Sequence, residues 1–185
     1  MRKFLILLLI LGTVFICGLK RAEAATTDTF QITITVNYIS INLLNQAGAD
    51  YGTWAIGQVA TSTASTMDSN NGGVGDEGIQ VDNTSNVAID IESYVSNTDG
   101  WTLGAAIGAD QFTLAAKAFT AWQAGPTPNM TGAVSITQTA GPGADITTNL
   151  AANTDTYLYY TLTAPSSVTS GAQKTLTVTV DATAF

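Results

Sequence analysis

One loop of this chain combines the residue types that bind a hard cation. Within residues 66–78, four side chains offer oxygen ligands and four glycines allow a tight backbone wrap that exposes carbonyls, which together suit calcium. The spacing departs from the helical calcium-loop pattern. Counted from Asp68, the fifth position is Gly72 where a ligand is required, and the twelfth is Ile79 where Glu is required. We predict calcium as a cofactor of this loop, and the alternative is a solvated Asn- and Gly-rich turn. The predicted ligands are Asp68, Asn70, Asp76 and Glu77.

The composition excludes several catalytic classes. The chain has no histidine, which removes serine–histidine catalysis and imidazole-ligated zinc sites. A pair of carboxylates could still act as general acid and base, as in glycosidases. The acidic residues are spread over turns and outward strand faces, so no particular pair is indicated. We therefore expect a protein that is not an enzyme.

The aromatic residues leave two alternatives open. Trp54, Trp101 and Trp122 could stack on sugar rings, or they could pack in a core. Tyr157 and Tyr159 alternate along one strand with Leu158, Tyr160 and Leu162. The two tyrosines therefore lie on the face opposite these three residues. We predict that these two tyrosines face solvent or cover an interface, unless a flanking loop buries that face as well.

The elements that would position these side chains are β-strands, because the dominant period of the chain is two. No segment shows a convincing helical stripe, although residues 114–122 could form either one short helical turn or a strand with its loop. Clusters of Gly, Asn, Asp, Ser and Pro separate the strands, as in antiparallel sandwiches. We predict an antiparallel, immunoglobulin-like β-sandwich of about seven to ten strands. Shorter candidate strands are residues 51–56, 78–81, 101–103, 111–115 and 133–137. The residues predicted to point inward are Val87, Ile89, Ile91, Leu158, Tyr160, Leu162, Leu176, Val178 and Val180.

The amino-terminal strand pattern is unusually long. Apolar residues alternate with small polar ones over residues 30–38, and the phase then flips so that Ile39, Ile41 and Leu43 carry the apolar positions. No charge occurs between Phe30 and Ala49, whereas exposed edge strands are normally blunted by Lys, Pro or inward charge. The first segment is therefore either central in its own sheet or paired with a neighbouring subunit. Its apolar positions are Phe30, Ile32, Ile34 and Val36.

The chain begins with an export signal. Arg2 and Lys3 precede an almost wholly apolar run, and residues 22–24 (Ala-Glu-Ala) form a small-x-small cleavage site. We predict a signal peptide at residues 1–24 and a single β-sandwich domain at residues 25–185, outside the cytoplasm. A retained anchor or lipidation of Cys17 are the alternatives.

Cleavage would leave a strongly acidic chain. Removing the four basic residues and the one acidic residue of the leader leaves two basic and 13 acidic residues, a net charge of −11. This charge disfavours nucleic acid and anionic membrane surfaces, so we expect no nucleic-acid partner and no membrane insertion after cleavage. The only cysteine, Cys17, leaves with the leader, so stability must come from core burial.

Several short motifs resemble those of small secreted bacterial β-sandwich proteins. They are residues 51–57 (YGTWAIG), 79–87 (IQVDNTSNV), 100–104 (GWTLG), 161–165 (TLTAP) and 174–180 (KTLTVTV). The chain is loosely similar in these segments to immunoglobulin-like surface domains, including camelysin-type subunits of matrix fibres. The resemblance implies a surface location and self-association with copies of itself or other surface proteins.

Two functions remain from the sequence. The first is a non-catalytic structural subunit of an extracellular fibre, layer or matrix that assembles by β-strand pairing. The alternative is a monomeric extracellular carbohydrate-binding or adhesion module.

Overall fold

The computed structural model describes residues 31–185, so the predicted signal peptide and Phe30 lie outside the described residues. Within this range every regular element is a β-strand, and no helix there is long and apolar enough to cross a membrane. The all-β prediction is confirmed, and the number of strands lies in the predicted range. The strands are β1 (Ile41–Leu44), β2 (Ala64–Thr66), β3 (Ile79–Asn83), β4 (Ile89–Asn97), β5 (Thr102–Leu103), β6 (Gln111–Phe119), β7 (Val134–Ile136), β8 (Ala144–Leu150), β9 (Asp155–Thr163) and β10 (Thr177–Ala184).

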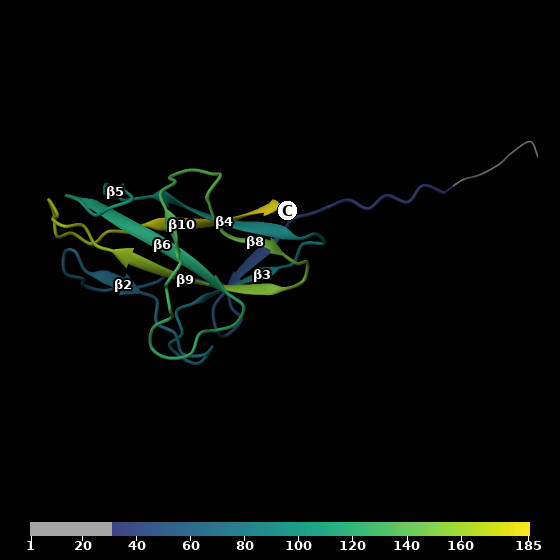
Figure 1. Ribbon diagram of the computed structural model, residues 1–185, viewed down its shortest axis with the longest axis horizontal. Coiled ribbons are helices and arrows are strands. Elements are labelled where there is room, and N and C mark those ends of the chain that lie inside the picture. The colour runs from purple at the N-terminus through teal and green to yellow at the C-terminus, as the bar shows by residue number, and fades with distance from the viewer. Residues whose placement is uncertain (1–30) are drawn as a thin grey trace, which may run out of the picture. The chain divides into compact units, whose positions relative to one another are not determined.

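The strands form two sheets, as expected for a β-sandwich (Figure 1). The larger sheet has the order β1-β3-β9-β6-β5, with β2 also paired to β9 and β7 also paired to β6. The smaller sheet has the order β10-β4-β8. All pairs are antiparallel except β5 with β6. Residues 36–185 make up one compact unit.

The core lies where the apolar positions of both sheets meet. Alternation places one face of each strand inward, so that Val81, Ile91, Phe112 and Leu158 are fully buried. The inward prediction is confirmed for Ile89, Ile91, Leu158, Tyr160 and Leu162. Val87, Leu176 and Val180 are partly buried against the same core, whereas Val178 is 37% exposed.

Some predicted boundaries were wrong. Residues 51–56 contain no strand, because their aromatic and apolar side chains pack on the core from a loop without ladder pairing. For residues 114–122 the alternative of a strand with its loop is confirmed, because β6 runs to Phe119 and a loop follows. The sequence did not predict β2 or β8. In β8 three consecutive polar residues, 147–149, leave only Ala144, Ile146 and Leu150 as apolar positions, too few to show the alternation clearly.

The predicted amino-terminal strand is absent from the described residues of that segment. Residues 31–40 form no strand and are exposed, so this segment is not central in a sheet of its own subunit. The second phase of the pattern does form a strand, because Ile41 and Leu43 of β1 pack against the core. The pairing of β1 with β3 therefore begins at Ile41, just after the position where the alternation of apolar residues was predicted to change face.

Asn83, at the end of β3, connects the two sheets. Its side chain is fully buried and its Nδ2 donates to the carbonyls of Leu150 (3.0 Å) and Ala151 (2.9 Å). Its Oδ1 accepts the N–H of Ser85 at 2.9 Å. A buried amide whose donors and acceptor are all used fixes the β3–β4 turn against the end of β8.

Candidate functional site

The predicted calcium loop folds around Asp76. This carboxylate is only 6% exposed. Its Oδ2 accepts the backbone N–H groups of Asn70 and Gly72, each at 3.0 Å, and its Oδ1 accepts the N–H of Gly78 at 2.9 Å. The hydroxyl of Tyr159 also donates to Asp76, at 2.9 Å from Oδ1. Asp76 therefore closes the loop on itself and fastens it to β9.

Tyr159 lies beneath this loop. Its side chain is fully buried, and its hydroxyl accepts the N–H of Gln123 at 3.1 Å while donating to Asp76. Burial raises the pKa of the Tyr159 hydroxyl well above its ordinary value, and the neighbouring Asp76 charge acts in the same direction. A Cβ at Gly78 would lie 2.5 Å from the Tyr159 ring, so only glycine allows the loop to approach this closely.

Glu77 holds the other side of the loop. Its Oε2 accepts the indole N–H of Trp54 at 3.0 Å and the backbone N–H of Asp68 at 2.8 Å. Its carbonyl accepts the hydroxyl of Tyr51 at 2.8 Å. The aromatic residues of the loop at 51–56 are therefore attached to the same short turn.

These contacts bear on the predicted calcium ligands. The oxygens of Asp76 already accept four hydrogen bonds, which uses the lone pairs that a cation needs. The amide nitrogen of Asn70 donates to the carbonyl of Val74 at 2.8 Å, and Asp68 is exposed. Over residues 31–185 no group of three or more His, Cys, Asp or Glu side chains could hold a metal. Calcium binding remains a prediction, and it would require donors to leave Asp76 and Glu77.

The structure distinguishes the two tyrosines that were predicted to face outward together. Tyr159 is covered by the loop around Asp76, so the flanking-loop alternative describes it and it offers no surface to a partner. Tyr157 is half-buried and its ring centroid lies 4.7 Å from that of Trp122, with the ring planes at 52°. Trp101 packs in turn on Phe112, with centroids 6.1 Å apart. All three tryptophans therefore pack against the core, and Trp54 also donates a hydrogen bond to Glu77.

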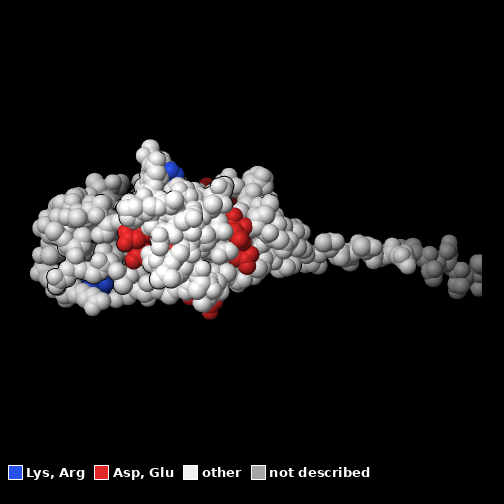
Figure 2. Space-filling view, turned by 90° about the horizontal axis from the view of Figure 1, so that it is seen from below, with Lys and Arg blue, Asp and Glu red and all other residues white. Residues whose placement is uncertain are grey.

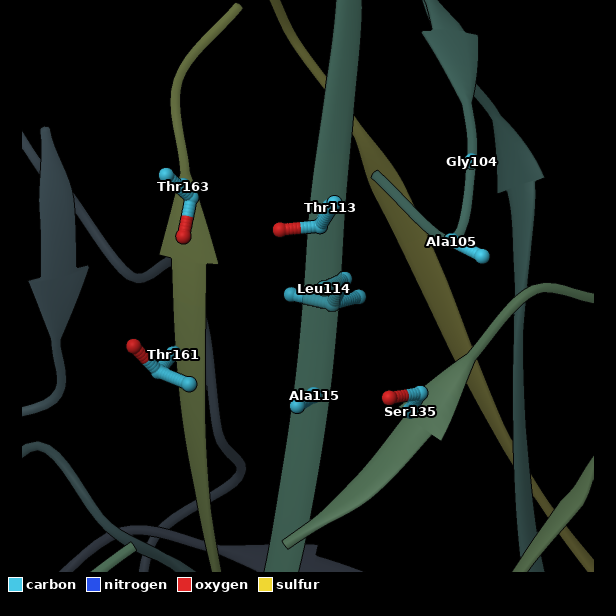
Figure 3. A pocket seen from close by; sticks show the side chains of 8 residues that line it. All are labelled: Gly104, Ala105, Thr113, Leu114, Ala115, Ser135, Thr161 and Thr163. Atoms are coloured by element: carbon cyan, nitrogen blue, oxygen red, sulfur yellow. The ribbon is translucent and has the colours of Figure 1, made fainter. Parts of the chain in front are cut away.

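A shallow hollow lies on the outer face of the larger sheet (Figure 3). It is formed across β6, β7 and β9 by small side chains and hydroxyls, and none of its lining residues is titratable. Such a surface can donate and accept hydrogen bonds but carries no general acid, general base or aromatic platform. The lining residues are Gly104, Ala105, Thr113, Leu114, Ala115, Ser135, Thr161 and Thr163.

The predicted assembly residues that the structure describes are all largely exposed. Ile32 is 71% exposed, Ile34 77% and Val36 73%, and Phe30 lies outside the described residues. The segment is anchored only from Val36 onward. Asn86 Nδ2 donates to the carbonyl of Val36 at 2.8 Å, and Asn86 Oδ1 accepts the N–H of Tyr38 at 2.9 Å.

The sequence did not identify Asn86 as this anchor. Its side-chain amide bonds one carbonyl and one N–H of the segment, as a neighbouring strand would. The only signal was its position in an Asn-rich turn. The same turn holds Tyr38, whose hydroxyl donates to the carbonyl of Thr84 at 2.8 Å.

No protein-family model, curated protein or solved structure matches this chain.

Proposed function

We propose that this protein is a secreted, non-catalytic structural protein that associates with copies of itself into an extracellular fibre, layer or matrix. One observation carries the proposal. Ile32, Ile34 and Val36 share one face of an extended segment, and each is more than 70% exposed. Burying a side chain of this type is worth about 1.5–3 kcal/mol, so this face gains substantially from a partner.

The backbone of the same segment is equally suited to pairing. Residues 31–36 alternate apolar and small polar side chains, contain no charge and no proline, and are not part of a ladder. An extended chain with free N–H and C=O groups can add to an open sheet edge, where backbone bonds give affinity and alternate side chains give specificity. Pairing with a second copy is the arrangement that uses both properties.

The surface charge and the leader support an extracellular role. The leader at residues 1–24 has the pattern of a cleaved export signal, and the remaining chain is acidic and free of cysteine. Figure 2 shows acidic side chains in separate groups on one face, with uncharged surface between them. Self-association through an uncharged segment avoids bringing these like charges together.

The environment of the buried and half-buried carboxylates favours a structural role over catalysis. Asp76 and Glu77 each accept N–H or O–H donors from the protein itself, and these bonds hold the loop in place. A general acid or base needs a free path to its substrate. Likewise, Trp54 bonds to Glu77 and Trp122 packs on Tyr157, so their contacts favour packing over sugar stacking.

The experiment compares assembly of residues 25–185 with two variants of the same segment. We expect high-molecular-weight ladders in size-exclusion chromatography with light scattering, and ordered assemblies by negative-stain microscopy. Ile32→Asn with Ile34→Asn should abolish assembly, while the matched control Thr33→Asn with Thr35→Asn should retain it. A protein that remains monomeric at millimolar concentration would refute the proposal, and glycan-array binding by that monomer would favour the carbohydrate-binding alternative.

A further inference from the structure

Strand β10 is the sheet edge best suited to receive the exposed segment. We infer, on the basis of the proposed self-association, that residues 31–36 of one copy pair antiparallel with β10 of the next copy, so that the copies join head to tail.

The other edges are poor acceptors. At the outer edge of β1 a tight turn follows, with Leu44 bridged to Asp50 and the N–H of Tyr51 bonded to the carbonyl of Leu43. Strands β5 and β7 are two and three residues long. Strand β8 has two register shifts in its pairing with β4, and Asn149 within it has a φ of 57°. Short or bulged edges resist strand addition.

Strand β10 is neither short nor bulged along its length, and its one local protection is the Asp181 carboxylate, whose Oδ1 accepts the N–H of Ala182 at 2.9 Å. It has eight residues, it pairs on one side with β4 alone, and its single register shift lies at its first residues. It contains one charge, Asp181, and neither lysine nor proline. It is therefore the longest regular open edge in the described part of the chain.

The core side of β10 is also incompletely covered. Val178 pairs with Val95 across the ladder, yet Val178 is 37% exposed and Val95 is 1% exposed. At the far end Ala184 is exposed while its partner Ile89 is fully buried. The inward side chains of β10 are therefore less buried than their partners on β4, and a strand added at the open edge of β10 would cover Val178 and Ala184.

The segment matches this edge in pattern. In an antiparallel pairing with Ile34 opposite Val180, Ile32 faces Ala182 and Val36 faces Val178, so apolar side chains meet on the core side. The opposite face then pairs Thr35 with Thr179, two residues that favour strands. A shift by one residue would expose the apolar face, so the pattern restricts the register.

The anchor at Asn86 determines where the segment at residues 31–36 meets the compact unit, and this position bears on the direction in which the segment can pair with β10. Phe185 N donates to the carbonyl of Ala88 at 3.1 Å, and Asn86 holds Val36, so the segment enters the compact unit at the end where β10 finishes. Pairing with β10 of its own chain would therefore run parallel. Antiparallel pairing with a second copy places the finishing end of one β10 at the starting end of the next, and repetition of this contact in one direction joins the copies into a non-closing chain. Antiparallel pairs are also the slightly more stable kind.

Engineered cysteines test the edge and the direction together. The chain after cleavage has no cysteine, so oxidation reports only the introduced pair. Thr35→Cys with Thr179→Cys should give disulfide-linked ladders on a non-reducing gel, since paired Cα atoms in a ladder lie within disulfide range. The matched control Thr35→Cys with Thr183→Cys should give no ladder. Cross-linking of the control within one chain, or only into dimers, would overturn the antiparallel assignment.

A charge variant separates this inference from the proposed function. Val178→Lys should reduce assembly at least tenfold with little change in the melting temperature of the compact unit, and Thr148→Lys on β8 should leave assembly unchanged. If the wild-type protein assembles but neither cysteine pair cross-links and Val178→Lys assembles normally, β10 is not the acceptor and only this inference fails. If the wild-type protein does not assemble, the proposed function fails with it.

Discussion

Replacing Asp76 by alanine tests the hydrogen bonds that close the loop at residues 66–78. The change removes the acceptor for three backbone N–H groups and for the Tyr159 hydroxyl, in a site where Asp76 is 6% exposed. A hydrogen bond to a charged group contributes about 1.5–3 kcal/mol, and bonds that share one carboxylate are not additive. Water can reach part of the loop after truncation, so we expect a loss of about 3–5 kcal/mol in the free energy of unfolding.

Urea denaturation followed by tryptophan fluorescence measures this loss. For a compact unit of this size it corresponds to a melting temperature lower by roughly 6–20 °C. Asp68→Asn is the matched control, because it removes a carboxylate charge from an exposed position of the same loop and should cost less than about 0.5 kcal/mol. A double-mutant cycle of Asp76→Asn with Tyr159→Phe should give a coupling energy of about 1 kcal/mol or more. Equal stability of Asp76→Ala and Asp68→Asn would refute the role assigned to Asp76.

Three further outcomes concern Tyr160, the predicted calcium loop and Asn83. Burial raises the pKa of Tyr160 to about 12, so the folded chain keeps a proton that the unfolded chain loses above about pH 10. The contribution of Tyr160 to the free energy of unfolding is therefore complete below about pH 10. Between about pH 10 and pH 12 it declines by about 1.4 kcal/mol per pH unit. Denaturation at several alkaline pH values should show this decline, and Tyr160→Phe should reduce its slope. Calcium at millimolar concentration should raise the melting temperature if it binds the loop, and the rise should be absent in Asp68→Asn; an unchanged wild-type value would exclude the predicted site. Asn83→Ala removes the Nδ2 donor from the carbonyls of Leu150 and Ala151, of which Ala151 keeps the Thr154 hydroxyl, and should cost about 2–4 kcal/mol. A cost below about 1 kcal/mol would contradict its role between the sheets.

Strands with strong alternation were predictable because burial of one face alone determines their phase. Strands β4, β9 and β10 follow the sequence pattern closely, with their apolar positions on the core side. Residues 51–56 have the same kind of composition, yet they form no strand because no neighbouring ladder pairs with them. Composition signals that a side chain will be buried, but pairing depends on contacts with distant segments.

The candidate site shows the same limit more clearly. The sequence identified the carboxylates of the loop at residues 66–78, and it could not indicate whether their oxygens were free. The contact between Asp76 and Tyr159 joins residues 83 positions apart, and it both saturates the carboxylate and buries the tyrosine. The alternation around Tyr159 places its side chain on the face opposite Leu158 and Tyr160, but only the fold shows that a loop buries this face as well.

The burial of Asn83 has a consequence for producing the protein. Asn83-Thr84-Ser85 is an acceptor sequence for N-linked glycosylation, as is Asn129-Met130-Thr131. A glycan on Asn83 would occupy the Nδ2 that bonds Leu150 and Ala151 and would have no room at a fully buried position. Asn129 is exposed and could carry a glycan without disturbing the core. In a eukaryotic secretory pathway, glycosylation of Asn83 would therefore compete with folding of the protein. A bacterial host without N-linked glycosylation avoids this competition.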